Sequence, residues 1–200
     1  MSISAEQVKE LRQRTGAGIL DCRKALEESG GDLDAAADIL RQKGLAKAAG
    51  RAGREASDGI IDLYSHGEGR LGVMVEVNTE TDFVARTPEF REFAHEMALQ
   101  VAATSPRWVS PDEVPEEILE KERELARQTA LADGKPEEVV DRIIDGKLEK
   151  FLNEACLLNQ PYVRDEDRKV SEVVQDLILA TGENVSIRRF ERWEIGEALE

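Results

Sequence analysis

Apolar side chains recur every three or four residues in three short runs within positions 1–44. That spacing places the side chains of each run on one face of a helix, so it predicts three short helices. Ser4 and Gln7 form a capping-box pattern before the first helix, and Gly44 is expected to end the third. The apolar stripes consist of Ala5, Val8 and Leu11, of Ile19, Cys22, Ala25 and Leu26, and of Leu33, Ala36, Ala37 and Leu40.

The pattern changes after residue 57, where strand-like and helix-like segments are mixed. Asp58–Tyr64 and Arg70–Val77 are rich in aliphatic residues and flank a turn sequence, which predicts a β-hairpin. Asn184–Ile195 is the expected last strand, although its alternation does not show which face is apolar. Further helices are expected after Thr87 and at 116–132, 137–156 and 171–180. These elements predict an α+β fold, in which an N-terminal three-helix bundle precedes a small antiparallel three-stranded sheet covered by helices.

The chain is expected to divide where its composition changes. Residues 45–57 are small and basic with little to bury, so they are expected to form a linker or an exposed helix. A three-helix module at 1–44 would precede this linker, and an α+β core and dimerisation domain at 58–200 would follow it. Charge follows a similar division, because residues 1–55 carry ten basic and nine acidic side chains whereas residues 56–200 carry 17 and 33.

The net charge of −15 argues against direct binding to nucleic acid, because phosphate recognition needs a basic face. No apolar run approaches the ~20 residues that a membrane span needs, so no membrane association is expected. The N-terminal sequence resembles neither a secretion signal nor a transit peptide, which predicts a cytoplasmic protein.

No motif for catalysis or cofactor binding stands out. The sequence has neither a phosphate-binding glycine loop nor histidines at metal-ligand spacing, so no cofactor, metal or small-molecule substrate is expected. His66 is expected in a hairpin and His95 on a helix surface. Cys22 and Cys156 are expected to be small buried side chains on apolar stripes.

One segment, between a strand end and a helix start, combines a bulky aromatic side chain with an acid. Asp82 and Phe83 follow the strand at 70–77 and precede Pro88. Phe83 could pack into the core while Asp82 caps a turn. Alternatively, the pair could project as a rigid wedge, because an aromatic ring beside a carboxylate can fill a partner's apolar slot and disturb its charges. The residues alone leave both alternatives open.

Several motifs, in order along nearly the whole chain, resemble the bacterial elongation factor Ts family. They are the N-terminal helices at 11–44, a TDFVA core after a strand at 75–87, and two C-terminal blocks at 146–163 and 185–197. The resemblance implies a non-enzymatic guanine-nucleotide exchange factor. Such a factor binds elongation factor Tu in its GDP form and promotes GDP release during translation elongation.

In that family the TDFV segment enters the GTPase domain of elongation factor Tu and disturbs its Mg²⁺ and phosphate site. By resemblance, this role carries over to Thr81, Asp82, Phe83 and Val84. Phe83 would be the steric wedge, Asp82 would supply charge or hydrogen bonding, and the other two would set and pack the loop. Loss of Mg²⁺ coordination weakens GDP binding because the cation offsets phosphate charge.

The family's N-terminal module docks on the same GTPase domain, which implies partner contacts by Arg12, Ile19 and Leu20. Many members carry two methionines where this chain has Ile19 and Leu20, so the contacts would persist with altered packing. Neighbouring helical positions point about 100° apart, so one of this pair is expected to face outward. Arg12 could instead be a solvated charge.

The chain resembles the short form of the family, which has a single core subdomain. Short members pair through that core, so a homodimer is implied, with Asn184–Ile195 as a pairing edge or surface. Longer members have a functional histidine on the core helix where this chain has Gln100, and no role is assigned to Gln100.

Two other classes stay open on the residues alone. A non-catalytic helical-bundle interaction module, similar to the ubiquitin-associated fold, would bind a partner through residues 1–44 and would not need Asp82 or Phe83. An acidic carboxylate enzyme would need a metal, for which the sequence has no ligand spacing. The charged segment 116–132 fits either a solvated face or a partner contact.

Overall fold

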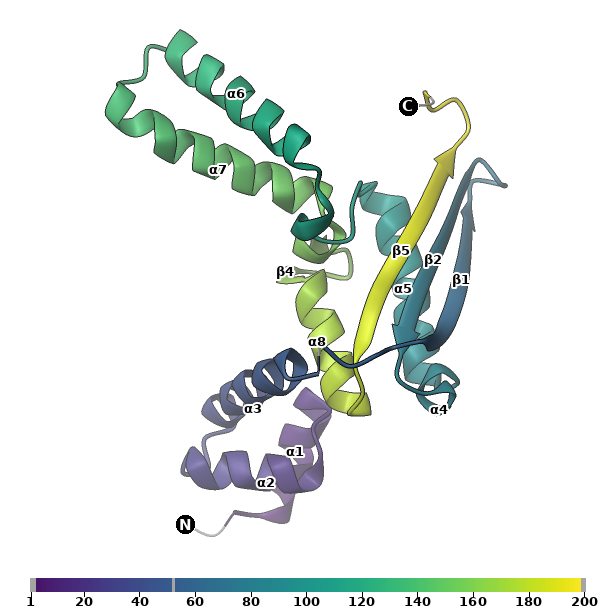
Figure 1. Cartoon of the computed structure of the whole chain (residues 1–200). Coiled ribbons are helices and arrows are strands. Elements are labelled where there is room, and N and C mark those ends of the chain that lie inside the picture. Colours follow the sequence, from purple (N-terminus) through teal and green to yellow (C-terminus); the bar gives the residue numbers. More distant parts are fainter. Residues whose placement is uncertain (1–2, 52, 199–200) are drawn as a thin grey trace.

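The structure, a computed structural model, describes residues 3–51 and 53–198 (Figure 1). Its helices are α1 (Ala5–Thr15), α2 (Ile19–Glu28), α3 (Leu33–Ala49), α4 (Asp82–Ala85), α5 (Pro88–Thr104), α6 (Glu116–Ala132), α7 (Glu137–Ala155) and α8 (Val170–Thr181), with 3₁₀ turns at Pro111–Glu113 and Leu157–Asn159. Its strands are β1 (Asp58–His66), β2 (Leu71–Thr79), β3 (Pro161–Tyr162), β4 (Asp165–Lys169) and β5 (Val185–Glu194).

The three predicted N-terminal helices are present and pack around their own small core. The capping box is confirmed, since the Ser4 hydroxyl accepts from the Gln7 backbone N–H and the Gln7 side chain accepts from the Ser4 N–H. The stripes meet as predicted, and the buried members are Leu11, Cys22, Ala25, Leu26, Ala36 and Leu40.

The predicted end of the third helix at Gly44 is wrong. Helix α3 continues to Ala49, so the first part of the expected linker at 45–57 is helical. Gly44 is buried against Leu179 of α8. The glycine therefore serves close packing between two helices instead of a left-handed helix stop.

The predicted three-stranded antiparallel sheet is confirmed, with strand order β1-β2-β5. Helices α5 and α8 cover its inner face (Figure 1). The main core lies between the sheet and these helices, and its largest fully buried members include Phe90, Met97, Leu157, Val75 and Val77. The opposite face of the sheet carries exposed side chains.

A β-bulge explains why the apolar face of the last strand cannot be read from simple alternation. Val77 pairs with Ile187 but Glu76 pairs with Arg189, so Arg188 is an extra residue in β5. The extra residue shifts the phase of alternation. Val185 and Ile187 before the bulge, and Phe190 after it, consequently all contribute to the main core.

Helices α6 and α7 form an antiparallel hairpin that projects away from the sheet (Figure 1). They pack on each other through a core of small and aliphatic residues, so unlike α5 and α8 they do not cover the sheet. The members of this core are Ala126, Ala130, Val140 and Ile144. Among the residues that the structure describes, no helix has both the length and the hydrophobicity to cross a membrane.

Candidate functional site

The turn after β2 presents Phe83 to solvent. Thr81 has extended backbone angles and caps the single helical turn α4, with its hydroxyl 3.5 Å from the Val84 backbone nitrogen. The Phe83 side chain that follows is 80% exposed. The alternative in which Phe83 packs into the core is therefore wrong, and an exposed ring is what the wedge hypothesis requires.

Asp82 and Val84, which flank Phe83 in the chain, have different contacts. The Asp82 carboxylate is half-buried and lies 2.8 Å from the Arg86 guanidinium. Val84 is half-buried and packs on the main core. Thr81, not Asp82, caps the turn, and the half-buried Asp82 carboxylate is paired with Arg86 next to Phe83 in the chain.

A single carboxylate, that of Glu183, holds the start of this turn. It accepts hydrogen bonds from the Thr79 hydroxyl at 2.9 Å, the Thr81 hydroxyl at 2.6 Å and the Thr81 backbone N–H at 3.0 Å. Burial by itself would raise the pKa of Glu183, but the hydrogen bonds from Thr81 and Thr79 outweigh it and hold that pKa below its ordinary value. Glu183 therefore stays ionised and fixes the backbone next to Phe83.

The neighbouring Glu80 is tied to the same part of the chain. Its carboxylate accepts from the Asn184 backbone N–H at 2.6 Å and lies 3.4 Å from the Arg54 guanidinium. Glu80, Glu183 and Asn184 are not predicted by the sequence as site residues. Glu183 and Asn184 lie about a hundred positions from Phe83, and no local motif marks them.

The N-terminal helices carry a second candidate surface. Ile19 and Leu20 are 57% and 74% exposed, and Arg12 is also exposed. The expectation that one of the two apolar residues faces outward is too narrow, because both do. Their neighbours Cys22, Ala25 and Leu26 face the core instead.

Arg12 and Ile19 share a groove of about 410 Å³ between α1 and α2. Apolar side chains and three basic residues line it: Ile3, Val8, Ile19, Lys9, Arg12 and Arg23. The sequence does not single out Lys9 or Arg23. Thr81–Val84 lie on a different part of the chain, so the structure forms two candidate partner surfaces, one on the N-terminal helices and one on the core.

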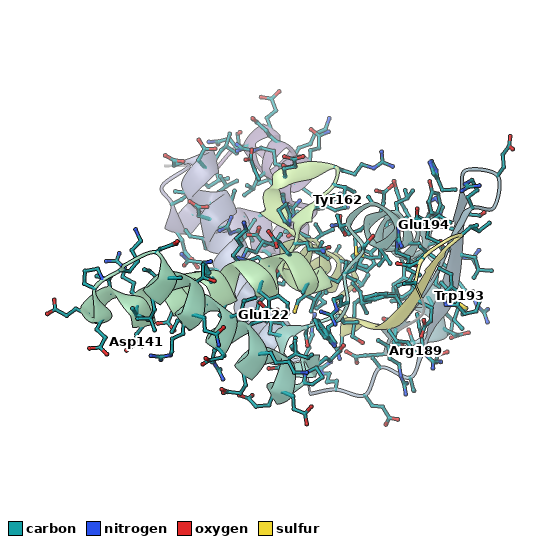
Figure 2. All side chains as sticks on the ribbon, turned by 90° about the horizontal axis from the view of Figure 1, so that it is seen from above. Glu122, Asp141, Tyr162, Arg189, Trp193 and Glu194 are labelled. Carbon is teal, nitrogen blue, oxygen red and sulfur yellow. The ribbon has the colours of Figure 1, made fainter. Side chains whose placement is uncertain are left out.

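The outer face of the sheet is a third exposed surface. Leu63 of β1 is 69% exposed and Trp193 of β5 is 74% exposed. The register places Leu63 opposite Met74, which also pairs with Glu191. Arg189 and Trp193 lie on the far side of the molecule from the α6–α7 hairpin (Figure 2). The result is an apolar strip flanked by charged side chains.

The histidine and cysteine side chains, which are often used in catalysis, do not gather in a common site among the described residues. His66 ends β1 and His95 is exposed on α5, where it lies 3.0 Å from Asp62. Cys22 and Cys156 are buried free thiols, as predicted, and burial raises the pKa of Cys156. Among the described residues, no three His, Cys, Asp or Glu side chains gather where they could hold a metal ion.

Gln100 is buried and hydrogen-bonded inside the protein. Its side chain is fully buried, donates to the Pro161 carbonyl at 3.0 Å and accepts from the Val163 N–H at 2.8 Å. These bonds join α5 to the β3–β4 hairpin. They satisfy a buried amide within the protein, so Gln100 does not lie at a surface that a partner could contact.

Comparison with known proteins decides the family. The profile described as Elongation factor TS matches residues 47–197. The chain is 55% identical over 198 residues to Elongation factor Ts of Caldanaerobacter subterraneus subsp. tengcongensis, covering 99% of each chain. This chain belongs to the elongation factor Ts family. It is therefore a member of a family of translation elongation factors.

Other relatives have similar lengths. The chain is 53% identical to Elongation factor Ts of Carboxydothermus hydrogenoformans over 98% of this chain and 91% of the relative. It is 52% identical to that of Coprothermobacter proteolyticus over 98% of this chain and the whole of the relative. The relatives thus share the short form, and the resemblance of the motifs to this family is confirmed.

Proposed function

We propose that this chain is the guanine-nucleotide exchange factor for elongation factor Tu. It binds the GDP form of that GTPase in the cytoplasm and promotes release of GDP. The observation that carries the proposal is the exposed Phe83 ring on a turn whose backbone is fixed by Glu183. Membership of the elongation factor Ts family supports the identity of the partner.

The geometry suits a wedge that does not rearrange as it binds. Thr81 and Val84 anchor both sides of the turn, so Phe83 can enter an apolar slot without a large loss of conformational entropy. Asp82 places a carboxylate beside the ring, where it can repel phosphate or compete for a cation. Disturbing the Mg²⁺ of the partner weakens its hold on GDP, because the cation offsets the phosphate charge.

Thermodynamic linkage fixes the direction of the effect. The chain must bind nucleotide-free elongation factor Tu more tightly than the GDP form, and GDP must then weaken its binding by the same factor. In this proposal the N-terminal surface formed by Arg12, Ile19 and Leu20 supplies affinity in both states. The Thr81–Val84 turn supplies the difference between the states.

We also propose that the chain is a homodimer that pairs through the outer face of its sheet. The apolar strip that includes Leu63 and Trp193 is exposed in the single chain. Flanking charges of both signs, such as Glu76 and Arg189 at 2.7 Å, allow two copies of the same face to match under twofold symmetry.

Release of a fluorescent GDP analogue from purified elongation factor Tu tests the exchange function. The wild-type chain should accelerate release strongly. Phe83→Ala and Asp82→Ala should each reduce the acceleration by about tenfold or more, equivalent to a loss of ~1.4 kcal/mol of differential binding. Complex formation should persist in both variants, because the N-terminal surface is intact.

Two controls use side chains that are exposed to solvent. Phe83 is outside the core, so Phe83→Ala should change the free energy of unfolding by no more than about 0.5 kcal/mol in urea titration. Leu131→Ala, at an exposed apolar residue of the α6–α7 hairpin, should leave exchange unchanged. No acceleration by the wild type contradicts the function. Full acceleration by Phe83→Ala and Asp82→Ala keeps the function but contradicts the wedge.

A further inference from the structure

Helix α3 approaches α8 closely at a residue without a side chain. A Cβ atom on Gly44 would lie 2.2 Å from Leu179 Cδ1 and 2.8 Å from Leu179 Cγ. A glycine inside a helix costs about 1 kcal/mol relative to alanine. The packing at Leu179 gives a reason for a glycine in the middle of α3.

Polar contacts also join α8 to α3 and to the residues that follow α3. The Arg51 guanidinium donates to the Ile178 carbonyl at 3.3 Å, and Arg41 lies 3.8 Å from Glu172. Beside these contacts is a cleft of about 340 Å³ between the N-terminal helices and α8. The N-terminal helices thus rest on α8 along a narrow strip, with open space next to it.

The end of α8 also holds the turn that carries Phe83. The helix stops at Gly182, which has a left-handed backbone, and the chain continues directly into Glu183 and Asn184. Glu183 binds Thr79 and Thr81, as described above. The Asn184 side-chain amide donates to the Arg54 carbonyl at 2.9 Å, so it fastens the segment after α3 to the same point.

We propose that the C-terminal half of α8, together with Glu183 and Asn184 that follow it, is the joint that sets the relative position of the two partner-binding surfaces. Leu179, through Gly44, is a positioning residue for the N-terminal surface, and Glu183 is a positioning residue for Phe83. This inference rests on the proposed exchange function for its kinetic consequences. The joint itself is a property of the chain alone.

The two ends of the joint should affect different kinetic parameters. Binding that is equal in the initial and activated complexes changes KM, whereas an interaction made only in the activated complex changes the maximal rate. Displacing the N-terminal helices removes binding energy that is equal in both complexes, so it should raise KM. Loosening the turn at Glu183 removes binding energy that is present only in the activated complex, so it should lower the maximal rate.

Gly44→Leu tests the N-terminal end of the joint. A leucine side chain at this position would overlap Leu179 where it now lies, and we expect the N-terminal helices to shift away from α8 while α3 stays helical. KM for elongation factor Tu in the release assay should rise by at least about fivefold, with the maximal rate little changed. Adding Leu179→Ala to this variant should restore most of the loss, because it vacates the contested space.

Matched variants separate positioning from folding. Gln42→Leu places the same side chain on an exposed position of α3 and should leave KM unchanged. Glu183→Gln should lower the maximal rate by about tenfold with KM little changed, because the amide keeps one acceptor oxygen where the carboxylate has two and cannot accept all three hydrogen bonds from Thr79 and Thr81. Loss of folded protein would lower the apparent maximal rate and leave KM unchanged, so the folded fraction of each variant is measured by circular dichroism before its rate is compared.

A distance measurement tests the joint without elongation factor Tu. Spin labels on Gln13→Cys and Glu89→Cys report the separation of the N-terminal helices from the core, since both residues are exposed and the native cysteines are buried. Gly44→Leu should shift or broaden the distance distribution, and Gln42→Leu should not. An unchanged distance together with an unchanged KM overturns the proposal. Absence of exchange by the wild type contradicts only the exchange function, because the distances still test the joint.

Discussion

Glu183 shows how one ionised side chain can control the conformation of a turn distant in sequence. Its carboxylate receives three hydrogen bonds from Thr79 and Thr81, two of them from hydroxyl groups. Charge-assisted bonds of this kind need the ionised acceptor, so protonation removes their advantage. The order of the Phe83 turn therefore depends on the charge of Glu183.

This charge predicts a difference in acid sensitivity between the wild type and Glu183→Gln. The folded-state pKa lies below the ordinary value of 4.5, so the carboxylate contributes stability that is fully present above about pH 4.5 and is lost as the pH falls through the folded-state pKa. At pH 7 the variant should be less stable by about 1–2 kcal/mol, a figure reduced for partial exposure to solvent. The gap should narrow as the pH falls below about 4.5.

Urea unfolding of both proteins between pH 3 and pH 7 measures this gap. A matched variant is Glu172→Gln, which keeps an oxygen to accept the Lys169 backbone N–H at 3.0 Å and loses only a carboxylate charge 3.8 Å from an exposed arginine. Its effect should be smaller at every pH. A gap for Glu183→Gln that stays constant across the range would contradict a role for the charge.

Single residues also show where sequence reasoning about the site reaches its limit. The sequence identifies Thr81, Asp82, Phe83 and Val84 as a group, because an acid and an aromatic ring stand together between a strand and a helix. It cannot decide whether Phe83 is buried, since both alternatives share the same local pattern. The answer depends on Glu183, whose contact with the turn exists only after the chain has folded.

At the scale of elements, most boundaries follow from local signals. Helix α6 occupies the predicted residues 116–132, because a proline precedes it and Gly134 follows it. Gly44 is misread because glycine has two uses, as a stop and as a site of close approach, and only the neighbouring helix distinguishes them. Strand β5 is ambiguous for a comparable reason, since a bulge is specified by pairing with β2.

The bulge in β5 predicts unequal effects for two single-residue deletions. Deleting Arg188 leaves an uninterrupted alternation that keeps Val185, Ile187 and Phe190 on the inner face. Deleting Ser186 forces either Val185 or Ile187 out of the core. The first deletion should change the free energy of unfolding by about 1 kcal/mol or less, and the second should cost about 3 kcal/mol or more.

Thermal and urea unfolding of the two deletion variants compare these effects directly. The exchange assay shows whether each deletion variant is still functional. Ser186 and Arg188 both lie outside the Phe83 turn, so a deletion that keeps the fold should also keep exchange activity. Equal destabilisation by the two deletions would mean that the bulge itself stabilises the sheet, through its twist or through the contact between Arg188 and Glu76 at 3.7 Å.

At the scale of the whole molecule, the sheet is covered on one face only. Helices α5 and α8 lie on its inner face, while α6 and α7 pack on each other and leave the outer face open (Figure 1). The sequence predicts the helices but not which surfaces they cover, because an amphipathic stripe does not name its partner. Contiguous exposed apolar side chains on a sheet, here including Leu63 and Trp193, mark an interaction surface.

This open face predicts that Leu63→Arg converts a dimer to a monomer. Leu63 lies on the edge strand β1, beside Met74 of the central strand, so two copies paired face to face would bury it. An arginine there would bring a charge and a longer side chain into an apolar contact, which should weaken dimerisation by about a hundredfold or more. The fold should be retained, because Leu63 is exposed in the single chain.

Sedimentation velocity at micromolar concentrations distinguishes the two states. The wild type should sediment as a dimer and Leu63→Arg as a monomer, with circular dichroism showing unchanged secondary structure in both. Leu131→Arg makes the same substitution at an exposed leucine of the α6–α7 hairpin and should remain dimeric. A monomeric wild type would contradict the dimer, whereas a dimer that survives Leu63→Arg but not Leu131→Arg would move the interface to the hairpin.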